Sequence, residues 1–289
     1  MANVQPNIEV MRDRVSRASE VRESIGSLWN EYRERRPRRF GLLADPVSDT
    51  RWTFVINTVE PMPARISTLF GEWLYLLRAA LDGTAYHVAV RDSGQNPPPN
   101  ERRIYFPIKD VAAKYDSPNH RKDLIAMSDS TFANLRAAQP FNAEPDHKSN
   151  ILWWIEELAR IDRHRYGHAL APHIVNARIR LEPPLTLLKH YFPDSATGRI
   201  PIDEAAPMPL LYFEAPADFD EPAIREHMDI SEAAETAIDV TEWASNASDL
   251  MKHMDLGERM WRCEDFVLEG IIEPMISGDP QPPTPTPSS

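Results

Sequence analysis

The sequence predicts an α+β protein that is mainly helical, with a long antiparallel helix pair, a small antiparallel sheet and acidic helices near the C-terminus. Two observations carry this prediction. Apolar residues recur at intervals of three and four over two long segments, which is the spacing of one helix face. Shorter segments alternate apolar and polar side chains, as strands with one buried face do.

Two long helices are expected in the first third of the chain. Residues 7–36 carry one narrow apolar stripe, and Pro37 ends that helix. Residues 64–91 follow Pro61 and Pro63 and carry a broad apolar face, so this helix is expected at the centre of the protein. A narrow stripe is typical of a helix hairpin, and we therefore expect the two helices to pack antiparallel.

The remaining predicted elements are shorter. Alternation of β-branched, aromatic and other residues predicts strands at 51–59, 103–108, 173–181 and 210–215. Helical spacing predicts helices at 129–138, from Ser149 to about Tyr166 with Gly167 at the end, and again from about residue 231. A proline-rich tail follows at 278–289.

Charge divides the chain unevenly. Residues 201–289 hold 20 acidic and four basic residues, a net charge of −16, whereas residues 1–200 carry +4. We therefore expect a helical core with short strands at 1–200 and an acidic part packed on it at 201–277. The basic part could face a polyanion, or the acidic helices could simply face solvent and keep the protein soluble.

The amino-acid composition also indicates the cellular compartment and excludes some kinds of binding site. A single cysteine, Cys263, excludes an internal disulfide and indicates a reducing compartment. The N-terminus lacks the apolar stretch of a secretory signal, and no apolar run is long enough to cross a membrane. The closest two of the ten glycines are eight residues apart, too far for a phosphate-binding loop. We expect a cytoplasmic protein with no membrane partner and no cofactor.

The end of the first helix is strongly basic. Arginines and aromatic residues alternate there: Arg33, Arg35, Arg36, Arg38 and Arg39 lie among Trp29, Tyr32 and Phe40. Cations stabilise the negative end of a helix, which is a structural explanation. Arginines among aromatic rings can also hold single-stranded nucleic acid by charge and stacking.

Residues 161–173 are the segment most suggestive of chemistry, and metal binding is one interpretation. His164 and His168 are four residues apart, so a continuous helix would place both imidazoles on one face. Asp162 or His173 could complete such a site. Gly167 opposes this interpretation, because it is expected to end the helix before His168.

A second interpretation is acid–base chemistry on RNA. Arg163, His164 and His168 match the pattern of arginine, a polar residue, any three residues and histidine. This pattern resembles the signature of the HEPN families, helical proteins that often cut RNA without a metal. The resemblance implies a homodimer in which His168 moves a proton, Arg163 binds the phosphate and His164 orients them.

The third interpretation is structural. Arg78 and Asp82 are four residues apart on the second predicted helix and can form an ion pair. Asp162 can pair with Arg165 or with Arg78. If these four residues meet, the network could bind a small anion, or it could only lock two helices together. In the second case the chain is a non-catalytic protein that acts through a protein partner.

Three short motifs also occur in order along the chain. They are Leu77-Arg78-Ala79-Ala80-Leu81-Asp82, Phe106-Pro107-Ile108 and Ile161-Asp162-Arg163-His164-Arg165. Together they resemble the marks of a family of bacterial proteins without an assigned activity. The resemblance covers about residues 60–170, with Arg163 at a position where the family pattern has lysine.

Overall fold

The structure is a computed structural model that describes residues 8–164, 170–191, 198–246 and 248–278, without the side chains of 163, 164, 231–234, 249 and 250. It confirms the α+β class, with 53% helix and 20% strand. The chain forms two compact units. Unit 1 comprises Met1–Gly26, Ser67–His168 and Asn246–Ser289, and unit 2 comprises Ser27–Ile66 and Ala169–Ser245. The boundaries expected near residues 200 and 277 stay a prediction.

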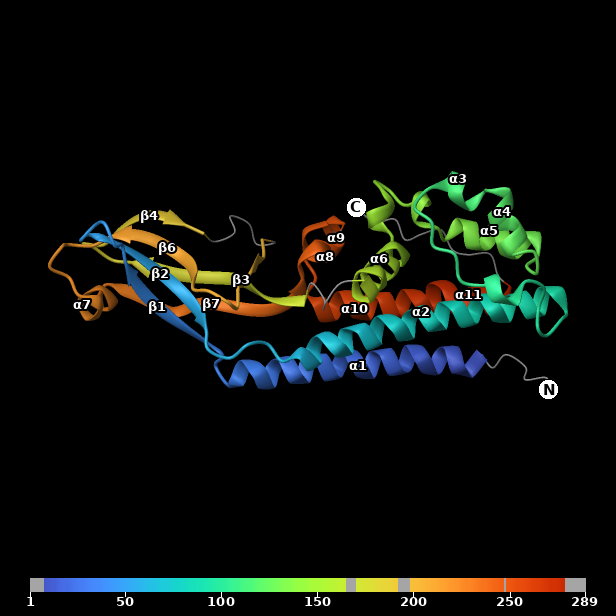
Figure 1. Ribbon diagram of the computed structural model, residues 1–289, viewed down its shortest axis with the longest axis horizontal. Helices are drawn as coiled ribbons and strands as arrows, with labels where there is room; N and C mark the ends of the chain where they lie inside the picture. Colours follow the sequence, from blue (N-terminus) through green and yellow to red (C-terminus); the bar gives the residue numbers. More distant parts are fainter. Residues whose placement is uncertain (1–7, 165–169, 192–197, 247, 279–289) are drawn as a thin grey trace. The chain divides into compact units, whose positions relative to one another are not determined.

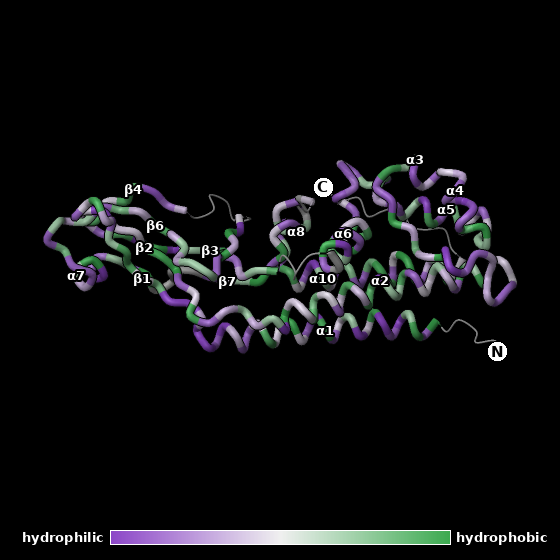
Figure 2. The backbone as a smooth tube through the Cα atoms, viewed as in Figure 1, coloured by the Kyte–Doolittle hydropathy of each residue, from purple (hydrophilic) through white to green (hydrophobic). Residues whose placement is uncertain are grey.

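The predicted pair of long antiparallel helices is confirmed. Helix α1 spans Ile8–Glu34 and helix α2 spans Ala64–Ser93, and they run side by side (Figure 1). The buried residues of α1 recur every three or four positions, which is the predicted narrow stripe: Met11, Val15, Ala18, Val21, Ile25, Trp29 and Tyr32. Hydrophilic and hydrophobic residues accordingly intermingle along α1 in Figure 2.

Helix α2 is the more deeply buried of the two, as its broad apolar face predicts. At least eight of its large apolar side chains are less than 5% exposed: Ile66, Leu69, Phe70, Trp73, Leu74, Leu77, Leu81 and Val88. Gly83 permits close approach to α1, because a Cβ there would lie 3.2 Å from Cγ of Met11.

Shorter helices complete unit 1. Their bounds are α3 Ala112–Tyr115, α4 Pro118–Asp123, α5 Asp129–Ala137, α6 Ile151–His164, α9 Asp249–Lys252, α10 Leu256–Asp265 and α11 Glu273–Ser277. A π-helical segment at Phe266–Ile272 connects α10 to α11. The predicted helices at 129–138 and 149–166 correspond to α5 and α6. Gly167 lies outside the described residues.

Unit 2 contains two antiparallel sheets that share one apolar core. The first sheet has the order β1 (Arg38–Ala44), β2 (Arg51–Thr58), β6 (Met208–Glu214) and β4 (Thr186–His190). The second has the order β5 (Ile200–Pro201), β3 (Leu170–Leu181) and β7 (Met228–Val240). The shared core includes Phe54, Ile56 and Phe213 from the first sheet and Ile174 from the second. Two short helices, α7 (Glu221–Glu226) and α8 (Thr241–Asn246), belong mainly to this unit.

Two predicted elements are wrong. Residues 103–108 are no strand: a short 3-10 turn at Glu101–Arg103 leads into a loop without regular structure. The chain from residue 231 is not helical at first, because β7 extends to Val240 and helices resume only at Thr241. Its alanines and glutamates suit a helix, but pairing along the length of β3 overrides that local preference.

Candidate functional site

The polar cluster around Arg78 joins α2, the loop at residues 104–109 and α6. Nη2 of Arg78 donates a hydrogen bond to the carbonyl oxygen of Phe106 (2.8 Å). The guanidinium also lies 3.2 Å from Oδ1 of Asp82 and 3.1 Å from Oε2 of Glu156. The same Asp82 oxygen accepts the Phe106 N–H at 2.9 Å. Only 14% of the Arg78 side chain is exposed, so its positive charge is paired inside the protein and not at the surface.

The loop at residues 104–109 has its backbone satisfied by side chains. Beyond the contacts of Phe106, the fully buried side chain of Gln139 donates from Nε2 to the carbonyl of Pro107 (2.9 Å). Its Oε1 accepts the N–H of Lys109 (2.8 Å). These bonds replace the ladder that a neighbouring strand would provide. The apolar sequence that resembles a strand is therefore buried without joining a sheet.

The structure brings two of the three sequence motifs into direct contact and places the third on the helix that packs beside them. Arg78 and Asp82 hold Phe106, and α6 carries Ile161 and Asp162. The carboxylate of Asp162 lies against Gly71 of α2, where a Cβ would come within 2.9 Å of its Oδ2. On α6 the ion-pair partner of Arg78 is Glu156.

The histidine segment begins at the end of α6. Arg163 and His164 are the last two residues of this helix, and their side chains lie outside the described part of the structure. Arg165 and His168 also lie outside the described residues. His173 is in β3 and is 1% exposed, with Nδ1 2.8 Å from the carbonyl oxygen of Ala171.

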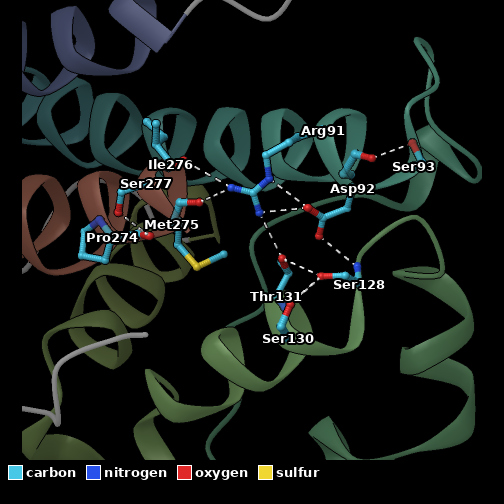
Figure 3. A network of polar contacts seen from close by, with 11 residues as sticks. Arg91, Asp92, Ser93, Ser128, Ser130, Thr131, Pro274, Met275, Ile276 and Ser277 are labelled. Carbon is cyan, nitrogen blue, oxygen red and sulfur yellow. Dashed lines mark hydrogen bonds and ion pairs between the residues drawn. The ribbon is translucent and has the colours of Figure 1, made fainter. Parts of the chain in front are cut away.

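A second polar network ties three helix ends together in unit 1 (Figure 3). Arg91 of α2 donates from Nη1 to the carbonyl oxygen of Met275 (2.7 Å) at the end of α11. Asp92 accepts the N–H of Ser128, the residue that caps α5, at 2.9 Å. Burial alone would raise the pKa of Asp92, but hydrogen bonds from Thr131, Ser128 and Arg91 outweigh it and lower that pKa.

The C-terminal helices carry a third set of charges, and these face α1 and α2. Glu264 is 4% exposed and accepts hydrogen bonds from Nε1 of Trp73 (2.9 Å) and Nε of Arg22 (3.1 Å). Cys263, the neighbouring residue, is fully buried, and burial raises the pKa of its thiol. A buried thiol of raised pKa is a structural side chain rather than a nucleophile.

Sequence reasoning identified the pair Arg78 and Asp82 but missed Glu156 and Gln139. The pair of Arg78 and Asp82 follows from their spacing of four residues on one helix. Glu156 is in a different helix, and Gln139 follows α5, so no local spacing connects either of them to Arg78 or to the loop. The only signal for Gln139 was a long polar side chain just after a predicted helix, and Glu156 within α6 had none.

Neither a metal-binding cluster among the described residues nor a similar known protein assigns a function to this site. Within the described ranges, no group of three or more histidine, cysteine, aspartate and glutamate side chains could hold a metal ion. No helix among these residues is both long and apolar enough to cross a bilayer. No protein-family model, curated protein or solved structure matches the chain. The two resemblances drawn from short motifs therefore stay predictions.

Proposed function

We propose that this chain is a non-catalytic interaction protein in which the cluster around Arg78 is a structural lock. The observation that carries the proposal is that the Arg78 guanidinium bonds to other groups of the protein. It makes one hydrogen bond to a backbone carbonyl and two ion pairs, with Asp82 and Glu156. Because its charge is paired and its side chain is largely buried, this guanidinium is engaged by groups of the protein itself.

The lock has an evident structural purpose. The loop at residues 104–109 has no sheet neighbour, so its buried N–H and carbonyl groups need other partners. Leaving one such group unpaired costs about 1–3 kcal/mol. Arg78 and Asp82 satisfy both backbone groups of Phe106, whose side chain is fully buried. The charged cluster thus holds the loop to α2 and, through Glu156, to α6.

A second candidate function is a HEPN-like, metal-independent ribonuclease that works as a homodimer. Its motif begins in α6, where Arg163 and His164 are the last residues that the structure describes before the gap at 165–169. On a continuous helix, side chains five residues apart point about 140° apart. The helix end that the sequence predicts at Gly167 would remove that restriction and let Arg163 and His168 converge on one phosphate.

RNA cleavage distinguishes the two functions. Labelled mixed-sequence RNA is incubated with the purified full-length protein, with and without EDTA, beside the variants His168→Ala and His253→Ala. His253 is an exposed histidine in unit 1 and serves as the matched control. We expect the RNA to remain intact in every arm. Cleavage that survives EDTA and disappears only in His168→Ala would overturn the proposal in favour of the ribonuclease. Cleavage that EDTA abolishes would overturn it in favour of a metal site at His164 and His168.

A further inference from the structure

The turn between α1 and β1 is the most basic segment of the molecule. Residues 33–39 contain five arginines and one glutamate, in a chain whose net charge is −12. The structure divides these arginines into two groups with different surroundings. We call residues 33–39 the arginine turn.

Two of the five arginines anchor the turn. The side chain of Arg38 is 8% exposed, lies over the rings of Trp29 (5.9 Å) and Tyr32 (5.5 Å), and pairs with Glu204 at 3.7 Å. Arg35 pairs with Glu60 at 2.8 Å. Trp29 and Tyr32 are 6% and 0% exposed, so neither ring can stack on a nucleic-acid base.

The other three arginines, Arg33, Arg36 and Arg39, are exposed. Their side chains form no ion pair and no hydrogen bond with any residue that the structure describes, helix carbonyls included. The helix end therefore does not use these charges through direct bonds. Each guanidinium keeps all five N–H donors for a ligand.

The backbone of the turn is fixed, so the free arginines are presented in a set arrangement. Arg36 has φ 51°, in the left-handed region that a residue with a side chain rarely adopts. The N–H of Arg36 donates to the carbonyl of Arg33 (2.9 Å), and the N–H of Val59 donates to the carbonyl of Pro37 (2.8 Å). Such rare conformations persist where surrounding contacts over-determine them, often at binding sites. A fixed turn also loses less entropy on binding.

We infer that Arg33, Arg36 and Arg39 bind the phosphodiester backbone of a nucleic acid. This inference rests on the proposed function, because it names the partner of the interaction protein. All three cations are arginines, whose planar guanidinium matches phosphate with two parallel hydrogen bonds. Since the neighbouring Trp29 and Tyr32 are buried and Phe40 is stacked on Phe54, contact is with phosphates alone. Binding is then independent of base sequence and similar for RNA and DNA.

The same observations disfavour two other polyanions. Stable binding to a membrane surface adds apolar side chains that enter the lipid, whereas here Trp29 and Tyr32 are buried and Phe40 is stacked on Phe54. An acidic peptide offers carboxylates on flexible side chains, whereas a nucleic acid offers closely spaced phosphates along one strand.

Fluorescence anisotropy tests the inference with a labelled 20-nucleotide RNA and a DNA of the same sequence. The test variant is Arg33→Gln/Arg36→Gln/Arg39→Gln. The matched control is Arg17→Gln/Arg160→Gln/Arg225→Gln, which removes the same charge from arginines that are already ion-paired, Arg17 with Glu20 and Glu72, Arg160 with Glu157 and Arg225 with Glu221. Unchanged urea unfolding midpoints show that both variants are folded.

We expect the test variant to bind both strands at least tenfold more weakly than the wild type, and the control to bind within twofold of it. Three phosphate contacts predict that raising the salt from about 50 to about 200 mM weakens wild-type binding roughly twentyfold. The test variant should show a much flatter dependence on salt.

Three results would overturn the inference. One is equal loss of binding in the control variant, and another is no binding by the wild type. The third is that phosphatidylserine vesicles or poly-glutamate bind through the three arginines while RNA does not compete. These failures leave the proposed function standing, because they involve no cleavage. Conversely, cleavage dependent on His168 would overturn the proposed function without removing the arginine-dependent binding.

Discussion

Asp92 shows how a single carboxylate joins separate helices. Only 7% of its side chain is exposed, and it pairs with Arg91 while it accepts the backbone N–H of Ser128, the residue whose hydroxyl caps α5. Burial disfavours the charged form, yet the bonds from Thr131, Ser128 and Arg91 lower its pKa below the usual value of about 3.9. The ionised carboxylate is therefore stabilised by the folded state.

This pKa predicts a pH-dependent contribution to stability. A carboxyl whose pKa is lowered on folding stabilises fully above its unfolded pKa and loses that contribution as the pH falls through the folded value. Wild type should exceed Asp92→Asn in free energy of unfolding at pH 7, and the difference should shrink below about pH 4. Urea titrations from pH 7 to pH 3 measure this difference in free energy of unfolding. A difference that is constant across this range would contradict the assigned role. Asp13→Asn, at an exposed carboxylate, controls for the substitution itself.

At the scale of residues, the sequence predicts contacts within one helix better than contacts between elements. The spacing of Arg78 and Asp82 predicts their ion pair, which the structure contains. The structure describes an ion pair between Arg78 and Glu156 of α6 that the sequence did not suggest. The suggested pairing of Asp162 with Arg165 or Arg78 stays a prediction, since Arg165 lies outside the described residues. Which turn of one helix meets which turn of another depends on packing of the whole unit, and spacing along the chain carries no information on it.

The π-helical connection between α10 and α11 lies between two ion pairs that hold this helical segment to α1. Arg22 contacts Glu264 before the π-helical segment, and Arg12 contacts Glu273 after it. The two contacts differ in burial: the side chain of Glu264 is 5% exposed and that of Glu273 is 33% exposed. Glu264 also accepts the indole N–H of Trp73, which is fully buried.

The difference in burial between Glu264 and Glu273 predicts that replacing each by glutamine lowers the free energy of unfolding by different amounts. Glu264→Gln should lower the free energy of unfolding by about 2 kcal/mol, because it leaves a buried charge-assisted network without its anion. Glu273→Gln should have a clearly smaller effect, because solvent screens that pair. Urea denaturation followed by circular dichroism compares the two variants. Equal losses, or a larger loss in Glu273→Gln, would show that Glu264 does not dock the helix.

The two mistaken elements have different physical causes. The segment at 103–108 is apolar and alternating, but Gln139, Arg78 and Asp82 satisfy its backbone, so no strand forms. Residues 231–240 contain helix-forming alanine and glutamate, and pairing with β3 decides their conformation. By contrast, α1, α2 and β2 lie within a few residues of their predicted bounds, because each has a long periodic pattern.

The two units are interleaved along the chain. Unit 1 draws on three segments and unit 2 on two, and both long helices begin in one unit and end in the other. The sequence could not predict this division, because charge and composition change along the chain while the units form by contacts across it. Each unit nevertheless has its own buried apolar residues, including Phe213 in unit 2 and Leu77 in unit 1.

Because each unit has its own apolar core, a core substitution should raise amide hydrogen exchange mainly in the unit that contains it. Phe213→Ala should remove about 3–5 kcal/mol from the sheet core and raise amide hydrogen exchange in β2 and β6 more than in α6. Leu77→Ala should have the opposite pattern. Hydrogen exchange read by mass spectrometry reports both regions in one experiment. If each variant raised exchange equally in both units, the molecule would unfold as a single cooperative body instead.

The stability of Arg78→Leu, compared with Arg160→Leu, tests most directly whether the charged cluster is a structural lock. Arg160 is half exposed and, among the residues that the structure describes, pairs with Glu157 on its own helix. Urea denaturation should show that Arg78→Leu loses about 2 kcal/mol, since Phe106 loses a hydrogen-bond donor and two carboxylates lose their cation. Arg160→Leu should unfold as the wild type does. An Arg78→Leu variant as stable as the wild type would contradict the account, because the guanidinium would then be free to serve a ligand.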